Sequence, residues 1–465
     1  PTLASLLTLA SLRPSPWSRM PAQVITDLEF VVTVDADSTV LTDTSILVVD
    51  GAIAAIGPAA ELLAAHPGAT RVDGRRKLAL PGLVNLHTHL PMTLLRGLAE
   101  DVDLQGFLRR VWAAEGAVMD PASVELGAEL GALESLRSGS TTQLDMYFHH
   151  AEAHRGAVTA GARHVLGPVF FAGPGPDGLD WRRRLEGLRD WPARLRAIGG
   201  ADIPLAACPH STYATEPDQL RELALALRAH GFTALTIHAS ENEAENRDVL
   251  ERFGRTPVQL LADVGLFDAG LHVTLGHGVR LDAQDQATVA AAGAAVAHCP
   301  GSNLKLASGA LPWRTYADAG IRLGLGTDGC SSSNDLDMWS VMRLAGLLAR
   351  LTSGRPDAVS AVDIVRAATI EGARALGLGD TIGSIEVGKS ADLVLLDLDA
   401  AHLTPVHDVH ALLVYAAGRG DVTDVFVAGE RVVAHRESTR VDEHDLYARC
   451  RERGAVAAAA AANAP

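Results

Sequence analysis

Residues 81–89 read Pro81-Gly82-Leu83-Val84-Asn85-Leu86-His87-Thr88-His89, and the rest of the expected fold is built around them. The mostly apolar run that begins at Leu78 predicts a buried strand, which ends in two histidines. Side chains two positions apart on a strand point the same way, so His87 and His89 can take adjacent positions around one divalent metal. A His-x-His pair alone also suits surface or core histidines, so other strands must supply the remaining ligands.

Composition and charge limit the classes of protein to which this chain can belong. Hydrophobic residues make up 48% of its 465 residues, which is enough for a large α/β domain and a smaller one. The formal net charge is −16, and the sequence has no basic cluster of the kind that follows phosphates. We therefore expect a neutral or cationic small-molecule substrate, and neither nucleic acid nor a membrane as a partner. A homo-oligomer is compatible with the sequence.

Cysteine usage and hydropathy favour a cytoplasmic protein. The four cysteines are widely separated and include no C-x-x-C pair, so neither a disulfide framework nor a structural zinc module is expected. No run approaches the ~20 apolar residues of a transmembrane helix. We expect residues 1–19 to be a disordered extension and Met20 to be the natural start. A degenerate signal peptide is the alternative, although no basic segment precedes its apolar part.

Short strands separated by turns are expected near both ends of the chain. The predicted strands lie at 28–34, 45–49, 52–56, 391–396 and 422–433. Because these β-rich segments flank a long middle part, we expect one discontinuous β-sandwich domain assembled from residues 20–78 and 383–440. A C-terminal helix with an alanine-rich tail is expected over residues 441–465.

The middle of the chain alternates between apolar strand-like runs and helical patterns, such as those over 217–229 and 281–292. After the strand that ends in the histidine pair, strand-like runs lie at 141–146, 164–171, 203–208, 234–239, 272–276, 294–299 and 321–327. Eight such units predict a (β/α)8 TIM barrel over residues 79–382. In these barrels the chemistry lies at the C-terminal ends of the strands.

Metal-competent and polar side chains gather at these predicted strand ends. They are His87, His89, Tyr147, His210, His238, His277, Asn303 and Asp328. Each alone also suits a capping or packing role, but their coincidence on several strands predicts one site. His238 would point at the metal, Glu241 could reach a water beside it, and Asp328 could supply an anionic ligand. Three histidines, one aspartate and a water form an open catalytic site rather than a closed structural one.

The chain resembles the amidohydrolase superfamily and, within it, the 5-methylthioadenosine/S-adenosylhomocysteine deaminases. The resemblance extends from about Ala52 to Leu396. Its segments include the stretch over 81–89, His210-Ser211-Thr212-Tyr213, His238-Ala239-Ser240-Glu241 and Gly326-Thr327-Asp328-Gly329. Further matching segments lie at 92–97, 146–149, 302–309 and 383–393.

The resemblance implies one bound metal per chain, usually zinc, with Fe²⁺ or another divalent metal as alternatives. The implied ligands are His87, His89, His238 and Asp328. Glu241 would be the proton shuttle, His277 would hold the attacking water, and Asp328 would take the second proton of that water. Dinuclear relatives keep a bridging carboxylated lysine at the end of the fourth strand, which here ends Cys208-Pro209-His210. A mononuclear site is therefore expected.

The implied activity is hydrolytic deamination of an aminated purine nucleoside of the adenosine, 5-methylthioadenosine or S-adenosylhomocysteine type, with release of ammonia. The expected substrate-binding residues are Glu115, His210, Arg163, Tyr147 and Asn303. Glu115 matches a family carboxylate that grips ribose hydroxyls, although a solvated helical charge is the alternative. Relatives that take S-adenosylhomocysteine often carry arginines for its carboxylate. Here Arg163 stands without a second one, so the methylthio nucleoside is expected to be at least as good a substrate.

Two other functions stay open at this point. The first is an amidohydrolase that acts on a free purine, a pterin or an s-triazine, by deamination, dealkylamination or dechlorination. The second is a catalytically silent scaffold protein. Silent relatives typically lose metal ligands, whereas this chain keeps every expected one.

Overall fold

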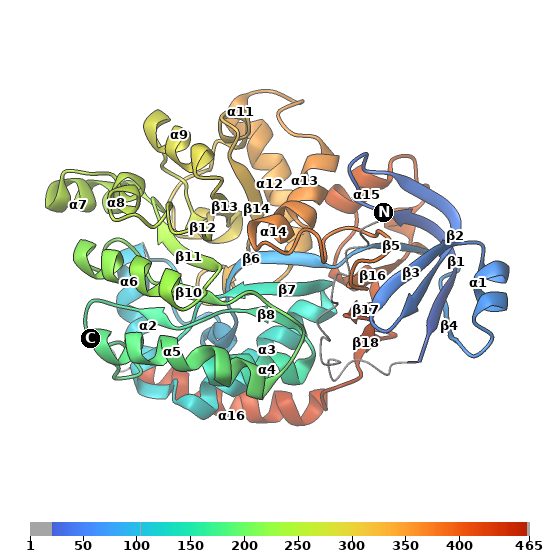
Figure 1. The fold of residues 1–465 in the computed structure, drawn as a ribbon, viewed down its shortest axis with the longest axis horizontal. Coiled ribbons are helices and arrows are strands. Elements are labelled where there is room, and N and C mark those ends of the chain that lie inside the picture. The colour runs from blue at the N-terminus through green and yellow to red at the C-terminus, as the bar shows by residue number, and fades with distance from the viewer. Residues whose placement is uncertain (1–20, 103, 463–465) are drawn as a thin grey trace, which may run out of the picture.

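The computed structural model describes residues 21–102 and 104–462, so the extension expected over 1–19 lies outside the described residues. Parallel strands run through the middle of the fold with helices around them, and a second, β-rich layer lies beside this assembly (Figure 1). Strands from both ends of the chain form that second layer.

The strands in the middle form two parallel ladders, β15-β6-β7-β8 and β9-β10-β11-β12-β13-β14. Their bounds are β6 Leu83–His89, β7 Ser140–Asp145, β8 Arg163–Val165, β9 Val169–Phe170, β10 Ala206–Pro209, β11 Ala234–Ala239, β12 His272–His277, β13 Ala295–His298, β14 Arg322–Leu325 and β15 Asp328–Gly329. The chain itself joins the ladders, because β8 and β9 are halves of the third strand, and β14 and β15 are halves of the eighth. These eight strand positions confirm the predicted (β/α)8 fold class.

The third strand breaks at Leu166-Gly167-Pro168. A Cβ atom at Gly167 would lie 1.6 Å from the carbonyl oxygen of Ala206, so the chain passes too close to β10 for any side chain there. Pro168 has no N–H to donate to a neighbouring strand. The run over 164–171 is therefore two short strands rather than the single strand that its hydropathy predicted.

Helices alternate with these strands along the chain. They are α3 Pro121–Arg137, α4 His150–Ala160, α5 Trp181–Ile198, α6 Pro217–Ala229, α7 Glu243–Phe253, α8 Pro257–Asp263, α9 Ala283–Ala291, α10 Pro300–Lys305, α11 Trp313–Asp318, α12 Met338–Ser353, α13 Ala361–Ala367 and α14 Ile370–Ala375. Helix α6 has the predicted bounds because its signals are local. Gln219 accepts the Glu216 N–H at 3.0 Å, Pro217 occupies the first turn, and the leucines of one face are buried.

The second layer is one sheet in the order β19-β18-β17-β16-β5-β1-β2-β3, with β4 beside β1. Its strands are β1 Gln23–Val32, β2 Val40–Val49, β3 Ala52–Gly57, β4 Thr70–Asp73, β5 Lys77–Pro81, β16 Leu393–Asp397, β17 Val422–Val427, β18 Glu430–Ala434 and β19 Glu437–Ser438. The antiparallel pair of β5 and β16 joins the N-terminal strands to the C-terminal ones. The expected domain boundaries stay a prediction.

The C-terminal helix α16 Glu443–Ala462 packs against α2 Leu104–Val118 and α3. Arg453 of α16 donates to the Val118 carbonyl and to Asp120, each at 2.7 Å, which ties down the end of α2. The remaining elements are α1 Ala59–Ala65, α15 Val409–Tyr415 and the 3₁₀ turns Leu90–Leu95, Ala401–Leu403 and Arg419–Asp421. Within residues 21–102 and 104–462, no helix is both long enough and apolar enough to cross a membrane.

Candidate active site

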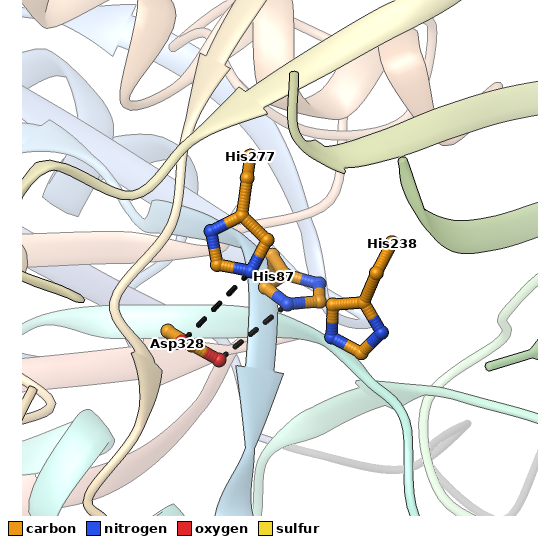
Figure 2. Close-up of side chains that lie close together, drawn as sticks. All are labelled: His87, His238, His277 and Asp328. Atoms are coloured by element: carbon orange, nitrogen blue, oxygen red, sulfur yellow. Dashed lines mark ion pairs between the residues drawn. The ribbon is translucent and has the colours of Figure 1, made fainter. Parts of the chain in front are cut away.

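Three histidines and one aspartate from four strands meet at one edge of the barrel (Figure 2). His87 lies in β6, His238 in β11, His277 at the end of β12 and Asp328 in β15. The parallel register of β15 and β6 places Asp328 opposite Thr88, between the two histidines of the first strand. One nitrogen or oxygen atom from each of the four clustered side chains lies within 4.8 Å of all the others.

His89 borders the same cluster. Its Nε2 atom lies 3.2 Å from Asp328 Oδ1 and 3.3 Å from the Nε2 atom of His238. The Nε2 atom of His87 lies 3.5 Å from that same carboxylate oxygen. The group of four within 4.8 Å contains His277 where the sequence predicted His89, although the Nε2 atom of His89 lies 3.2 Å from the Asp328 carboxylate and that of His277 lies 3.9 Å from it. The predicted ligand set is compatible with this geometry and stays a prediction.

Backbone carbonyls orient two of the imidazole rings. His89 donates its Nδ1–H to the Met146 carbonyl at 2.7 Å, and His238 donates its Nδ1–H to the His210 carbonyl at 2.8 Å. Because a carbonyl oxygen can only accept, each ring carries a proton on Nδ1 and turns its Nε2 atom towards the cluster. Metal-binding histidines are oriented in this way by their outer partners.

The His87 side chain supports a metal in this cluster. It is completely buried, and neither of its ring nitrogens makes a hydrogen bond. Burial lowers the pKa of His87 to about 4 and that of His238 well below its ordinary value, so both rings are neutral at pH 7, which is the form that binds metals. An unpaired buried polar group costs about 1–3 kcal/mol, and a divalent cation would satisfy it. The residues present fit a divalent-metal site.

Two glycines let the first strand and its histidines pack closely against their neighbours. A Cβ atom at Gly276 would lie 3.0 Å from Cε1 of His87. A Cβ atom at Gly329 would lie 2.6 Å from the Met92 sulfur and 3.1 Å from Cβ of His89. A larger residue at Gly276 would press on the His87 ring, and one at Gly329 would clash with Met92 and crowd His89.

His277 lies between two carboxylates. Its Nε2 atom is 3.9 Å from Glu241 Oε2 and 3.9 Å from Asp328 Oδ2, while its Nδ1–H donates to the Asn303 amide oxygen at 2.8 Å. Burial raises the pKa of Glu241, which brings that carboxyl closer to the range in which it can exchange protons at neutral pH. Asn303 orients His277 and is not among the described residues that line the pocket, and its role as a substrate contact stays a prediction.

Ser332 belongs to the site, although the sequence reasoning missed it. Its hydroxyl donates to Asp328 Oδ2 at 2.7 Å and also faces the pocket. Asp328 Oδ1 is the oxygen that approaches His87 and His89. The serine thus holds the carboxylate in one rotamer. The polar run directly after the strand end at Asp328 was the signal available in the sequence.

A pocket opens above the cluster. Its polar lining includes Glu115, Tyr147, His210, Glu241 and Asp328. Its apolar lining includes Phe107, Leu108, Val111, Trp112, Phe148, Val169 and Phe171. No lysine or arginine is among the described residues that line the pocket.

Glu115 is a buried pocket residue rather than a solvated helical charge. It is 3% exposed, and it accepts the Tyr147 hydroxyl at 2.6 Å. Burial raises the pKa of Glu115 to about 7, and the bond from Tyr147 opposes this only in part. Helix α2 carries Glu115 on the same face as Phe107 and Val111, so one helix supplies both a carboxylate and an apolar wall.

His210 lies in the same pocket, surrounded by rings. Its centroid is 5.0 Å from that of Phe171, 5.8 Å from that of Tyr213 and 6.3 Å from that of Trp112. Burial lowers the pKa of His210 to about 3, which keeps the ring neutral. A neutral imidazole beside aromatic rings suits a flat heterocycle as a ligand.

Arg163 does not reach the pocket, and its prediction as a substrate contact is wrong. Its guanidinium binds Asp392 at 2.9 and 3.0 Å, the Asp202 carbonyl at 2.7 Å and the Ser390 hydroxyl at 3.1 Å. The physical reason is its place at the beginning of β8. The beginning of a barrel strand faces away from the C-terminal rim where the cluster lies.

Known proteins resemble this chain over most of its length. The model of the amidohydrolase family matches residues 78–432, and that of a bacterial imidazolonepropionase-like composite domain matches residues 46–69. The 5-methylthioadenosine/S-adenosylhomocysteine deaminase of Moorella thermoacetica is 39% identical over 399 residues, which cover 86% of this chain and 91% of the relative. The enzyme of the same name from Thermococcus kodakarensis is 40% identical over 78% of this chain and 84% of its own.

Solved structures agree with this relationship. An adenosine deaminase from Xanthomonas campestris with bound zinc superposes with a TM-score of 0.87 at 36% identity, covering 94% of this chain and 98% of the other. An atrazine chlorohydrolase from Arthrobacter aurescens complexed with zinc has a TM-score of 0.83 at 26% identity, covering 93% of this chain and 99% of the other. By the extent of the family match and the identity to these relatives, the chain belongs to the amidohydrolase family.

Proposed function

We propose that this protein is a metal-dependent hydrolytic deaminase of adenine nucleosides, which replaces the ring amino group by a carbonyl and releases ammonia. The observation that carries the proposal is the joint presence of the His/Asp cluster and the buried Glu115–Tyr147 pair in one pocket. The first suits hydrolysis at a C–N bond, and the second suits a ribose diol. The relatives named as nucleoside deaminases support the same assignment.

We assign the metal to His87, His89, His238 and Asp328, with His277 beside it. The zinc in the deaminase from Xanthomonas campestris supports zinc as the metal of this chain. When bound, such a cation lowers the pKa of water from 15.7 towards about 7 and so provides a nucleophile at neutral pH. Side chains of the protein carry out the proton transfers and orient the attacking water.

Glu241 moves the first proton. It accepts a proton from the attacking water and gives it to a ring nitrogen of the purine, which makes the adjacent carbon electrophilic. His277 fixes the direction of attack, because Asn303 holds its Nδ1–H and leaves Nε2 to face the water. Asp328 takes the second proton of the water and passes it to the leaving amine. Water and the aminopurine thereby become a ring carbonyl and ammonia.

The lining of the pocket also indicates which 5′ substituent of the nucleoside fits best. Apolar side chains of α2 and of the loop after β9 form its outer wall. Arg184 lies behind Phe171, with its guanidinium carbon 5.3 Å from the ring centroid, but both of its terminal nitrogens bind Asp177 at 2.6 and 2.9 Å. A carboxylate on the substituent would meet a guanidinium that is already paired. An uncharged thioether is the better fit.

Ammonia release tests the proposal directly. The zinc-loaded protein is incubated with adenosine, 5-methylthioadenosine, S-adenosylhomocysteine, free adenine, a pterin and aminated s-triazines. We expect ammonia from the nucleosides at rates well above those for adenine. Release from a triazine, a pterin or free adenine alone would assign the chain to the alternative hydrolase activity, and no release from any compound would favour a silent scaffold.

A further inference from the structure

Glu245 is a buried carboxylate to which no role has been assigned so far. It lies in the first turn of α7 and is 5% exposed. Its two oxygens bind two different loops. Oε2 accepts the backbone N–H of Glu241 at 2.7 Å, and Oε1 accepts the hydroxyl of Thr212 at 3.0 Å.

Both of these loops form the pocket. Thr212 follows β10 and stands between His210 and Tyr213, which line the pocket. Glu241 follows β11 and lies beside His277. The carboxylate of Glu245 therefore links the loop that carries the proposed proton shuttle to the loop that carries the aromatic wall.

The turn before Glu241 needs such support. Ser240 is a buried residue with a φ of 53°, in the left-handed region that residues other than glycine rarely adopt. The next residue, Glu241, donates its backbone N–H to the Glu245 carboxylate. The Ser240 carbonyl accepts the backbone N–H of Arg280 at 3.0 Å. The direction in which the Glu241 side chain leaves the backbone depends on this turn.

Helix capping does not account for Glu245. The N-cap of α7 is Asn242, whose side chain accepts the Glu245 N–H at 2.8 Å. The side chain of Glu243, in the same turn, is exposed and offers the helix dipole a negative charge. The buried position of Glu245 therefore serves the loops and not the helix.

We infer that Glu245 is a positioning residue for the proposed deamination, which sets the Glu241 carboxylate relative to the purine held by the His210–Tyr213 loop. The inference rests on the proposed function, in which Glu241 moves the protons. Small displacements of a proton-transferring group are costly to the rate, and loss of a supporting partner typically lowers activity about 10- to 100-fold.

The test compares Glu245→Ala, Glu245→Gln and the matched control Glu243→Ala in the zinc-loaded protein, with 5-methylthioadenosine as substrate. Glu245→Ala should lower kcat about 10- to 100-fold, with zinc content at one per chain and KM little changed. Glu245→Gln should recover most of kcat, because its amide oxygen still accepts the Glu241 N–H and its amide nitrogen can donate to Thr212. Glu243→Ala should behave as the unsubstituted protein.

Wild-type kcat in Glu245→Ala would overturn the inference, as would a loss of activity that Glu245→Gln fails to recover. If Glu245→Ala does not fold, Glu245→Gln combined with Thr212→Val decides, since it removes one of the two anchors. An unchanged kcat in that double variant would overturn the inference. Two parallel measurements separate the claims. No ammonia release from 5-methylthioadenosine by the unsubstituted zinc-loaded protein would refute the proposed function, and an active Glu241→Gln would refute the role of Glu241. An inactive Glu241→Gln beside a fully active Glu245→Ala would refute only the role of Glu245.

Discussion

Arg163 and Asp392 form a buried ion pair that joins the barrel to the β-sheet layer. The Nη2 and Nε atoms of Arg163 lie 2.9 and 3.0 Å from the two carboxylate oxygens, and both side chains are at most 2% exposed. The backbone carbonyl of Asp392 also accepts the Gly82 N–H at 2.9 Å, just before β6 begins. One aspartate thus fixes the base of the first and third barrel strands.

Arg163→Met should destabilise the protein while leaving kcat and KM little changed. Breaking a buried ion pair leaves an uncompensated charge and costs about 3–5 kcal/mol. Thermal unfolding measures the loss, and Arg182→Met is the control because that arginine side chain is 90% exposed. An unchanged melting temperature together with a higher KM for S-adenosylhomocysteine would restore Arg163 as a substrate contact.

His89→Ala should remove most of the bound metal. Its Nε2 atom lies 3.2 Å from Asp328 Oδ1 and 3.3 Å from the Nε2 atom of His238, so its loss removes one nitrogen from the proposed ligand set. Elemental analysis of the purified variant measures the metal, with His230→Ala, an exposed histidine at the end of α6, as the control. Full metal retention in His89→Ala would leave His277 as the third histidine ligand.

Glu241→Gln should retain the metal and lose catalysis. The amide keeps the shape of the side chain but cannot carry a proton from water to the ring, and such losses are on the order of 10²- to 10⁴-fold. Metal content and the steady-state rate of ammonia release are measured on the same sample. Wild-type turnover in this variant would show that another group moves the protons.

Glu115→Ala should raise KM for nucleosides much more than for free adenine. Charge-assisted hydrogen bonds to a ribose diol are worth about 1.5–3 kcal/mol, or roughly ten- to a hundredfold in kcat/KM. Because burial raises the pKa of Glu115 to about 7, the carboxylate becomes protonated as pH falls below that value. The ratio of kcat/KM for nucleoside over adenine should therefore fall from pH 8 to pH 6 in the unsubstituted protein. In Glu115→Ala this ratio should be low and independent of pH, and an identical pH response would contradict the assignment.

5-Methylthioadenosine should be at least as good a substrate as S-adenosylhomocysteine. The described pocket lining has no lysine or arginine, and Arg184 is paired with Asp177. Competition kinetics with both nucleosides measure the preference. A strong preference for S-adenosylhomocysteine would mean that Arg184 exchanges Asp177 for the substrate carboxylate, and Arg184→Met would then abolish that preference.

Much of the fold was predictable because its signals are local. The bounds of α6 and β11 follow from capping residues and from apolar runs of a few residues. In a (β/α)8 barrel the functional residues lie at the C-terminal ends of the strands. Once the strands were located in the sequence, His87, His238 and Asp328 could therefore be predicted to lie close together, as they do.

The sequence by itself determined which residue types lie at the strand ends, because each strand can be recognised from the hydrophobic pattern of its own residues. Only the tertiary structure decided what those residues touch. In the fold, Arg163 hydrogen-bonds to Asp392, Asn303 to His277 and Glu245 to Thr212. The partners in these pairs lie 229, 26 and 33 positions apart in the sequence. The tertiary structure also divided the third strand where Gly167 passes the carbonyl of Ala206. Such contacts depend on how strands pack against one another, and no local pattern in the chain records that packing.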